Sequence, residues 1–150
     1  NDTKINNMLF CKQSDDAKAV IDLDTCMPGY WLFDFGDMVR TFCSPEQEDS
    51  TNLSNVRVRE EIFAAIVKGY VEPLQDVITD AEKESFWLGT KVMTFMIGLR
   101  FLTDFSDGDN YFATKHANHN LERARNQFAL YRDILEKEHT LKAILEINKG

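Results

Sequence analysis

The chain has 150 residues, of which 43% are hydrophobic, so it is long enough for one domain with a packed core and too short for two ordinary ones. Its formal net charge of −8 argues against a nucleic-acid partner, because no basic stripe offsets the acidity. The three cysteines have no regular spacing, which predicts free thiols. No basic-then-apolar segment opens the chain, so we expect no secretion signal and a cytoplasmic protein.

The first two dozen residues predict a β-hairpin that closes a polar loop. Apolar segments at residues 8–12 and 18–23 predict two strands, and a turn rich in Ser and Asp separates them. Asp2 and Asn7 precede the first strand, and the second strand brings back Asp22. Two carboxylates and an amide oxygen that meet at the base of a hairpin can hold a hard cation and accept a proton from a hydroxyl group.

After the hairpin the pattern changes to loops and helices. Residues 25–31 contain Pro28-Gly29 and predict a loop, residues 34–42 predict a short helix, and residues 44–55 predict a polar linker on the surface. Apolar residues recur at spacings of three and four over residues 58–70, which predicts an amphipathic helix.

The second half of the chain predicts two further helices. Thr79 and Glu82 have the pattern of a capping box, and the helix that follows extends to about Phe105. It is apolar almost all round, but Arg100 and an earlier lysine interrupt it, so we expect a buried core helix and not a membrane span. Helical periodicity returns over residues 121–145. The expected fold is therefore mainly α with one small β-hairpin.

Several segments resemble the kinase-like phosphotransferases. Asp2 and Asn7 have the Asp-x-x-x-x-Asn spacing of a kinase catalytic loop, and Asp22 stands where the metal-binding Asp follows. The segments Asp-Thr-Lys-Ile-Asn-Asn, Val-Ile-Asp-Leu-Asp-Thr and Leu-Arg-Phe-Leu-Thr-Asp-Phe look like those of sugar kinases in the aminoglycoside phosphotransferase superfamily, and among these the N-acetylhexosamine 1-kinases. The similarity extends from residue 1 to about Tyr131.

The resemblance implies that residues 1–150 are the C-terminal lobe of a protein-kinase-like fold. The implied reaction is ATP-dependent phosphorylation of the anomeric hydroxyl of an N-acetylhexosamine, with Mg²⁺ as cofactor and ATP as co-substrate. Asp2 would be the general base and would contact the sugar, while Asn7 and Asp22 would hold magnesium. Asp24 either supports a second metal ion or orders the loop.

The parts of a kinase that cover the nucleotide are missing from this sequence. The seven glycines are scattered and form no phosphate-binding loop, so we expect the N-terminal nucleotide lobe to be absent and the isolated chain to be inactive. The missing lobe of the same protein would be a partner, and its absence would expose an apolar face that favours self-association.

Four further residues are considered near the site. Asp34-Phe35-Gly36 spells a kinase metal motif, but no apolar strand precedes it; the resemblance implies that Asp34 instead accepts backbone hydrogen bonds from the catalytic loop. We expect Asp37 to be a carboxylate at a helix start. Arg100 either forms an ion pair, for example with Asp104, or, as the resemblance implies, reaches the sugar together with Tyr111.

Other residues favour structural interpretations. His116 and His119 lack further ligands at zinc spacing and are expected on the surface, and Trp31 and Trp87 are expected in the core. The segment Cys26 to Tyr30 lacks the arginine of the sulfatase signature Cys-x-Pro-x-Arg, so it does not support the mucin-desulfatase label that some relatives of these kinases carry.

Two alternatives remain open at this point. The chain could serve a phosphotransferase that acts on another small alcohol, such as an aminoglycoside or choline. It could also be a non-catalytic helical interaction domain in which the acidic loop is incidental. In neither case do we expect contact with a membrane.

Overall fold

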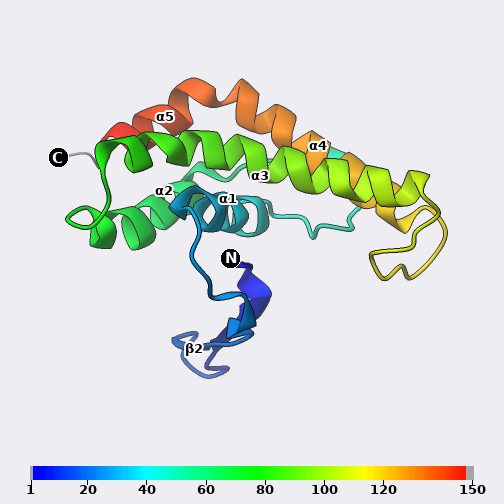
Figure 1. Ribbon diagram of the computed structural model, residues 1–150, viewed down its shortest axis with the longest axis horizontal. Coiled ribbons are helices and arrows are strands. Elements are labelled where there is room, and N and C mark those ends of the chain that lie inside the picture. The colour runs from blue at the N-terminus through cyan, green and yellow to red at the C-terminus, as the bar shows by residue number, and fades with distance from the viewer. Residues whose placement is uncertain (1, 148–150) are drawn as a thin grey trace.

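The computed structural model describes residues 2–147, which are mainly helical with one small antiparallel sheet, as predicted (Figure 1). In chain order the elements are β1 (Met8–Phe10), β2 (Ala17–Val20), α1 (Trp31–Phe42), α2 (Glu60–Ile66), α3 (Asp80–Ser106), α4 (His119–Glu136) and α5 (Glu138–Ile147). Helix α3 lies between α1 and α4, and the hairpin projects from the helical body on the side of α1 (Figure 1).

The contact between α1 and α3 brings two backbones together. A Cβ atom added to Gly36 on α1 would lie 2.3 Å from the carbonyl oxygen of Gly89 on α3. One added to Gly89 would lie 2.2 Å from the carbonyl oxygen of Leu32. Only glycine fits at either position, so these two residues set the distance between the helices.

The core lies where α1, α2 and α3 meet. Phe35, Phe63 and Phe86 are fully buried, and the ring centroids of Phe35 and Phe86 are 4.9 Å apart. Tyr70 packs its ring against Phe35 and Phe86. The core continues to α4 and α5 through buried aliphatic side chains (Leu130, Ile134, Leu141).

The start of α3 follows the predicted capping box. The backbone N–H of Glu82 donates to Thr79 Oγ1 at 3.3 Å, and the N–H of Thr79 donates to the Glu82 carboxylate at 2.7 Å. Two of the free N–H groups at the helix start are thereby satisfied. Among residues 2–147, no helix has both the length and the apolar character needed to cross a membrane.

The boundaries of several helices differ from the predictions. The predicted helix over residues 121–145 is divided into α4 and α5 at Lys137. There the Asp133 carboxylate accepts the Val58 N–H at 2.6 Å, and Lys137 Nζ donates to the Val58 carbonyl at 2.7 Å. These bonds hold Val58 in an extended segment, so α2 begins only at Glu60. Helix α1 likewise starts earlier than predicted, at Trp31.

The hairpin is shorter than predicted, and its strands are exposed. Met8 pairs with Val20, but pairing ends at Phe10 and Ala17. Leu9 is 47% exposed and Val20 59% exposed. These apolar side chains stay exposed because, within the described residues, no second layer packs on the sheet. The three cysteines (Cys11, Cys26, Cys43) are free thiols, as predicted.

Candidate functional site

The loop before β1 is closed by hydrogen bonds among its own residues. The Asn7 side chain donates to the Asp2 carbonyl at 2.9 Å and to Asp2 Oδ2 at 3.0 Å. Lys4 Nζ contacts the same Oδ2 at 2.9 Å. Burial raises the pKa of the Asp2 carboxyl, but the hydrogen bonds from Lys4 and Asn7 outweigh it and leave the pKa below its ordinary value. Asp2 is therefore an ionised, oriented carboxylate at neutral pH.

The hairpin returns the chain to this loop. The Ile21 N–H donates to the Asn7 carbonyl at 2.9 Å, and Asp22 follows in the left-handed region with φ 62°. A hydrogen bond and charge repulsion from Asp24 raise the pKa of Asp22, with smaller contributions from burial and from Asp2. The hairpin thus brings the backbone next to Asp22 onto Asn7, and the charges of Asp24 and Asp2 both act on the Asp22 carboxyl.

The residues near the hairpin base carry the kinds of oxygen donor that a magnesium ion prefers. Asn7 uses its NH₂ group for Asp2, because both contacted atoms are acceptors, and this leaves its amide oxygen for another partner. Asp22 and Asp24 are adjacent exposed carboxylates whose repulsion a cation would relieve. Within residues 2–147 no group of three or more His, Cys, Asp or Glu side chains is placed to hold a metal. An ion here would need phosphate oxygens to complete its coordination, as Mg²⁺ commonly does.

Helix α1 supports the loop from the other side. The Thr3 hydroxyl donates to the main-chain carbonyl of Asp34 at 2.8 Å, and the Tyr70 hydroxyl lies 3.5 Å from the Asp34 carboxylate. Asp34 is in the first turn of α1 and does not follow a strand. The contact with Thr3 therefore runs through the Asp34 backbone.

We expected Asp37 at the start of a helix, and this position is wrong. It lies inside α1, is buried, and accepts two hydrogen bonds from Arg40, at 3.0 Å from Nε and 2.7 Å from Nη2. Arg40 is also buried and contacts Glu48 through Nη1. Burial lowers the pKa of Arg40, but the two carboxylates outweigh it and raise the pKa above its ordinary value. The sequence signal for this pair was the i, i+3 spacing of Asp and Arg, which we did not use.

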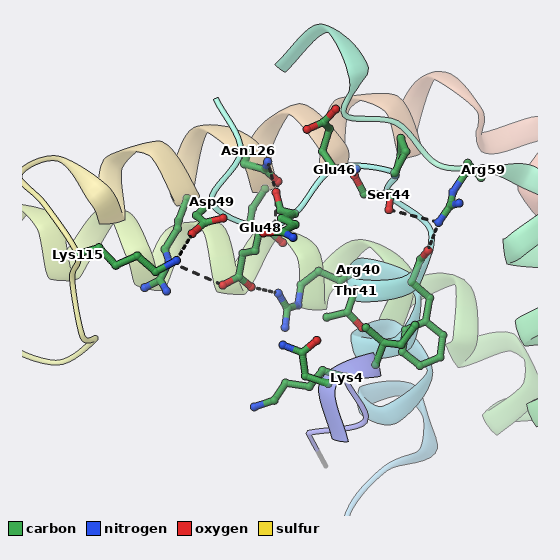
Figure 2. A pocket seen from close by; sticks show the side chains of 17 residues that line it. Lys4, Arg40, Thr41, Ser44, Glu46, Glu48, Asp49, Arg59, Lys115 and Asn126 are labelled. Carbon is green, nitrogen blue, oxygen red and sulfur yellow. Dashed lines mark hydrogen bonds and ion pairs between the residues drawn. The ribbon is translucent and has the colours of Figure 1, made fainter. Parts of the chain in front are cut away.

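Arg40 and Lys4 line a cavity of about 630 Å³ (Figure 2). Its walls come from the loop of residues 4–6, the end of α1, residues 44–49, and α4. Among the described residues, its lining contains five cationic side chains (Lys4, Arg40, Arg59, Lys115, Arg123) and three carboxylates (Glu46, Glu48, Asp49). Sequence reasoning did not identify this cavity.

Residues 44–55, predicted as a polar linker on the surface, are at least partly exposed, and they are also docked on α4. The Asn126 side chain on α4 donates to the carbonyls of Gln47 and Ser50, each at 3.0 Å. The Asp49 carboxylate contacts Lys115 Nζ at 2.7 Å (Figure 2). These bonds join the segment to α4 and give the cavity a defined side.

His119 is also part of this wall, so its expected surface position is wrong. Its side chain is 1% exposed, and its Nδ1 accepts the Lys115 N–H at 3.2 Å. Nε2 therefore carries the proton of the neutral ring and donates to Asp49 at 3.3 Å. His116 is exposed, as expected, and contacts Glu122 at 3.5 Å.

Arg100 and Tyr111 lie together, and their expected contact with the sugar stays a prediction. The Arg100 guanidinium lies over the rings of Tyr111 and Phe112, at 5.4 and 5.3 Å from the centroids. Both Arg100 and Tyr111 are exposed, and neither lines the cavity. The proposed ion pair of Arg100 with Asp104 does not form.

The Asp104 carboxylate is hydrogen-bonded to the loop that follows α3. Its carboxylate accepts the backbone N–H groups of Asn110, Tyr111 and Phe112 at 3.0, 2.8 and 2.9 Å, and the Asn120 side chain at 2.8 Å. Burial raises the pKa of Asp104, but these hydrogen bonds outweigh it and lower the pKa. Asp104 thus fixes the loop that carries Tyr111.

The tryptophans pack as expected. Trp31 packs against the core with its ring edge on Tyr70, at 6.4 Å between centroids. Trp87 also packs on the core, and Lys91 and Lys142 lie over its ring at 5.2 and 5.4 Å.

Comparison with known families finds a match for the first half of the chain. Residues 1–71 match the phosphotransferase enzyme family, APH. The matched segment contains the loop, the hairpin, α1 and α2, and so includes Asp2, Asn7, Asp22 and Asp24. The match covers slightly less than half of the chain, and it supports a relation to the aminoglycoside phosphotransferase superfamily, whose members are phosphotransferases.

Proposed function

We propose that this chain is the acceptor-binding lobe of an ATP-dependent kinase that phosphorylates the anomeric hydroxyl of an N-acetylhexosamine. The observation that supports the proposal is the contact of Asn7 with Asp2, together with the return of the hairpin to Asn7 just before Asp22, inside the segment that matches a phosphotransferase family. The choice of an N-acetylhexosamine as acceptor rests on the sequence resemblance.

Asp2 is suited to act on the acceptor hydroxyl. Its carboxylate is ionised, and Lys4 and Asn7 hold one of its oxygens in a fixed direction. It would accept the proton of the sugar hydroxyl while that oxygen attacks the γ-phosphoryl group of ATP. General bases of this kind accelerate reactions about 10²- to 10⁴-fold.

Asn7, Asp22 and Asp24 are suited to hold magnesium, which supplies charge neutralisation on the phosphates of ATP when bound. Asn7 offers its amide oxygen, and Asp22 offers an exposed carboxylate just after β2. Asp24, whose charge acts on Asp22, either shares the ion or orients the Asp22 carboxylate.

Replacing Asp2 tests the proposal in a protein that joins this chain to a nucleotide-binding lobe. We expect Asp2→Asn to lower kcat for N-acetylglucosamine and ATP by about a hundredfold or more, because the amide cannot accept the proton. Formation of the sugar 1-phosphate is the measurement, and the thermal midpoint should be unchanged.

The matched control is Asp76→Asn, which changes an exposed carboxylate outside the site. It should leave kcat unchanged. Turnover by Asp2→Asn at the wild-type rate would remove Asp2 from the mechanism. A wild-type protein that phosphorylates an aminoglycoside or choline but no hexosamine would keep the loop chemistry and reject the proposed acceptor.

A further inference from the structure

The backbone of Asp2 has an uncommon conformation. Its φ angle is 62°, in the left-handed region that residues other than glycine rarely adopt. Aspartate tolerates this region better than most residues do, but the surrounding structure still has to hold it there. Burial does not supply that hold, because the Asp2 side chain is 32% exposed. The hydrogen bonds around Asp2 therefore determine its conformation.

The peptide unit between Asp2 and Thr3 is held from two sides. Its carbonyl oxygen, which belongs to Asp2, accepts a hydrogen bond from the Asn7 side chain at 2.9 Å. The Thr3 hydroxyl donates to the main-chain carbonyl of Asp34 at 2.8 Å. Because a peptide unit is planar, fixing its oxygen and the residue that follows it also restricts the backbone of Asp2.

The carbonyl that accepts the Thr3 hydroxyl belongs to a rigid part of the molecule. Asp34 is in the first turn of α1, and the next residue, Phe35, is fully buried. One residue further, Gly36 lies so close to Gly89 on α3 that no Cβ fits between them. A residue tied to a packed helix is held more precisely than one tied to another loop.

The two bonds hold Asp2 against different parts of the chain. The bond from Asn7 joins residues five positions apart and fixes Asp2 relative to the exposed hairpin. The bond from Thr3 joins residues 31 positions apart and refers the same loop to the helical body. A general base has to lie within hydrogen-bond reach of the hydroxyl that it deprotonates, and a displacement of about 1 Å can lower a rate about a hundredfold.

We propose that Thr3 is a positioning residue, which sets the direction of the Asp2 carboxylate by binding the adjacent peptide to the first turn of α1. Thr3 acts through Asp2 and needs no contact with a substrate. Its effect on phosphate transfer rests on the proposed function, whereas its effect on the conformation of Asp2 does not.

Thr3→Val removes the hydroxyl and keeps the shape of the side chain. In the protein that joins this chain to a nucleotide-binding lobe, we expect this variant to lower kcat with N-acetylglucosamine by about tenfold or more, because the base is displaced. KM for the sugar and for ATP should stay unchanged, and so should the thermal midpoint. Thr3→Ser retains the hydroxyl and should keep the wild-type kcat.

The matched control is Thr94→Val in α3. The Thr94 hydroxyl also donates to a main-chain carbonyl, that of Thr90, at 3.1 Å, and it lies away from the loop. This variant should leave kcat unchanged. A kcat that falls equally in Thr3→Val and Thr94→Val, or that falls in Thr3→Val only together with the thermal midpoint, would show a general structural role and would overturn the inference.

The side-chain amide of Asn7 reports the conformation of Asp2 without ATP or sugar. Its NH₂ group donates to the Asp2 carbonyl and to Asp2 Oδ2. In NMR spectra of the 150-residue chain, Thr3→Val should shift the two amide proton signals and speed their exchange with water. Thr3→Ser and Thr94→Val should leave them as in the wild type. Unchanged signals in Thr3→Val would contradict the proposed tether.

The two proposals fail in different ways. If the Asn7 signals depend on the Thr3 hydroxyl but the protein with its nucleotide lobe transfers no phosphate, the positioning of Asp2 stands and the kinase proposal fails. If phosphate is transferred while Thr3→Val leaves kcat or the Asn7 signals unchanged, the kinase proposal stands and the role of Thr3 is wrong.

Discussion

The hairpin region of residues 2–30 and the helical body that follows both contain large apolar side chains, but only the body buries them. Leu9, Phe10 and Val20 in the hairpin are about half exposed, whereas Phe35 and Phe86 in the body are fully buried. The difference lies in the packing partners: α1 and α3 cover each other, and only one layer of two strands forms the hairpin. We infer that the body provides the stability of the fold and the hairpin region carries the proposed chemistry.

A hydrogen bond joins the two regions. Thr3 binds the Asp34 carbonyl, and Lys4 faces the cavity that α1 and α4 help to form. The body therefore orients the loop without enclosing it. Substitutions in the hairpin should change function with little loss of stability. Substitutions in the body should lower stability and should affect function less.

The largest expected effect is a difference in the free energy of unfolding between two phenylalanine-to-alanine variants. Phe35→Ala should lower the free energy of unfolding by about 3–5 kcal/mol, because it leaves a cavity among fully buried rings. Phe10→Ala, in a half-exposed strand, should cost less than about 1 kcal/mol. Urea denaturation measures both values. Equal costs would show that the hairpin shares the core of the body.

A somewhat smaller effect is expected at the contact of α1 with α3. Gly36→Ala should destabilise the chain by about 3 kcal/mol, because its Cβ would meet backbone that cannot move away without separating the helices. Gly69 is the control, since a Cβ there meets nothing within 4 Å. Gly69→Ala should be neutral or stabilising by about 0.4–1 kcal/mol. An unchanged thermal midpoint for Gly36→Ala would contradict the close approach.

The smallest effect concerns the loop after α3 and depends on pH. The pKa of Asp104 is lower in the folded chain than its unfolded value of about 3.9, so its stabilisation is present above that value and is lost as the pH falls through the folded pKa. Asp104→Asn should lower the thermal midpoint by several degrees at pH 7 and should flatten the loss of stability below about pH 4. Midpoints measured from pH 2 to pH 7 test this, and parallel curves for the two proteins would contradict it.

Some elements could be predicted because their causes are local. The capping box at Thr79 and Glu82 involves residues three apart, and the short turn of the hairpin brings Asp22 back toward Asn7. The Asp2–Asn7 contact likewise lies within one loop. None of these three features depends on distant segments of the chain.

Other features could not be predicted because they depend on residues far apart in the chain. His119 is buried because Asp49, 70 residues earlier, folds against it. Lys137 ends α4 because it binds the Val58 carbonyl, 79 residues earlier. Glu48 lies near both Arg40 and Arg123 because the segment of residues 44–55 is docked on α4.

The sequence by itself determined the mainly helical class, the start of α3, and the loop whose residues match a phosphotransferase family. It could do so because helix periodicity, capping and hairpin pairing act over a few residues. The tertiary structure alone decided where α4 ends, which charges are buried, and that a cavity forms beside Lys4. A buried ion pair or a cavity wall requires surfaces from several elements, and their alignment follows from packing and not from local pattern.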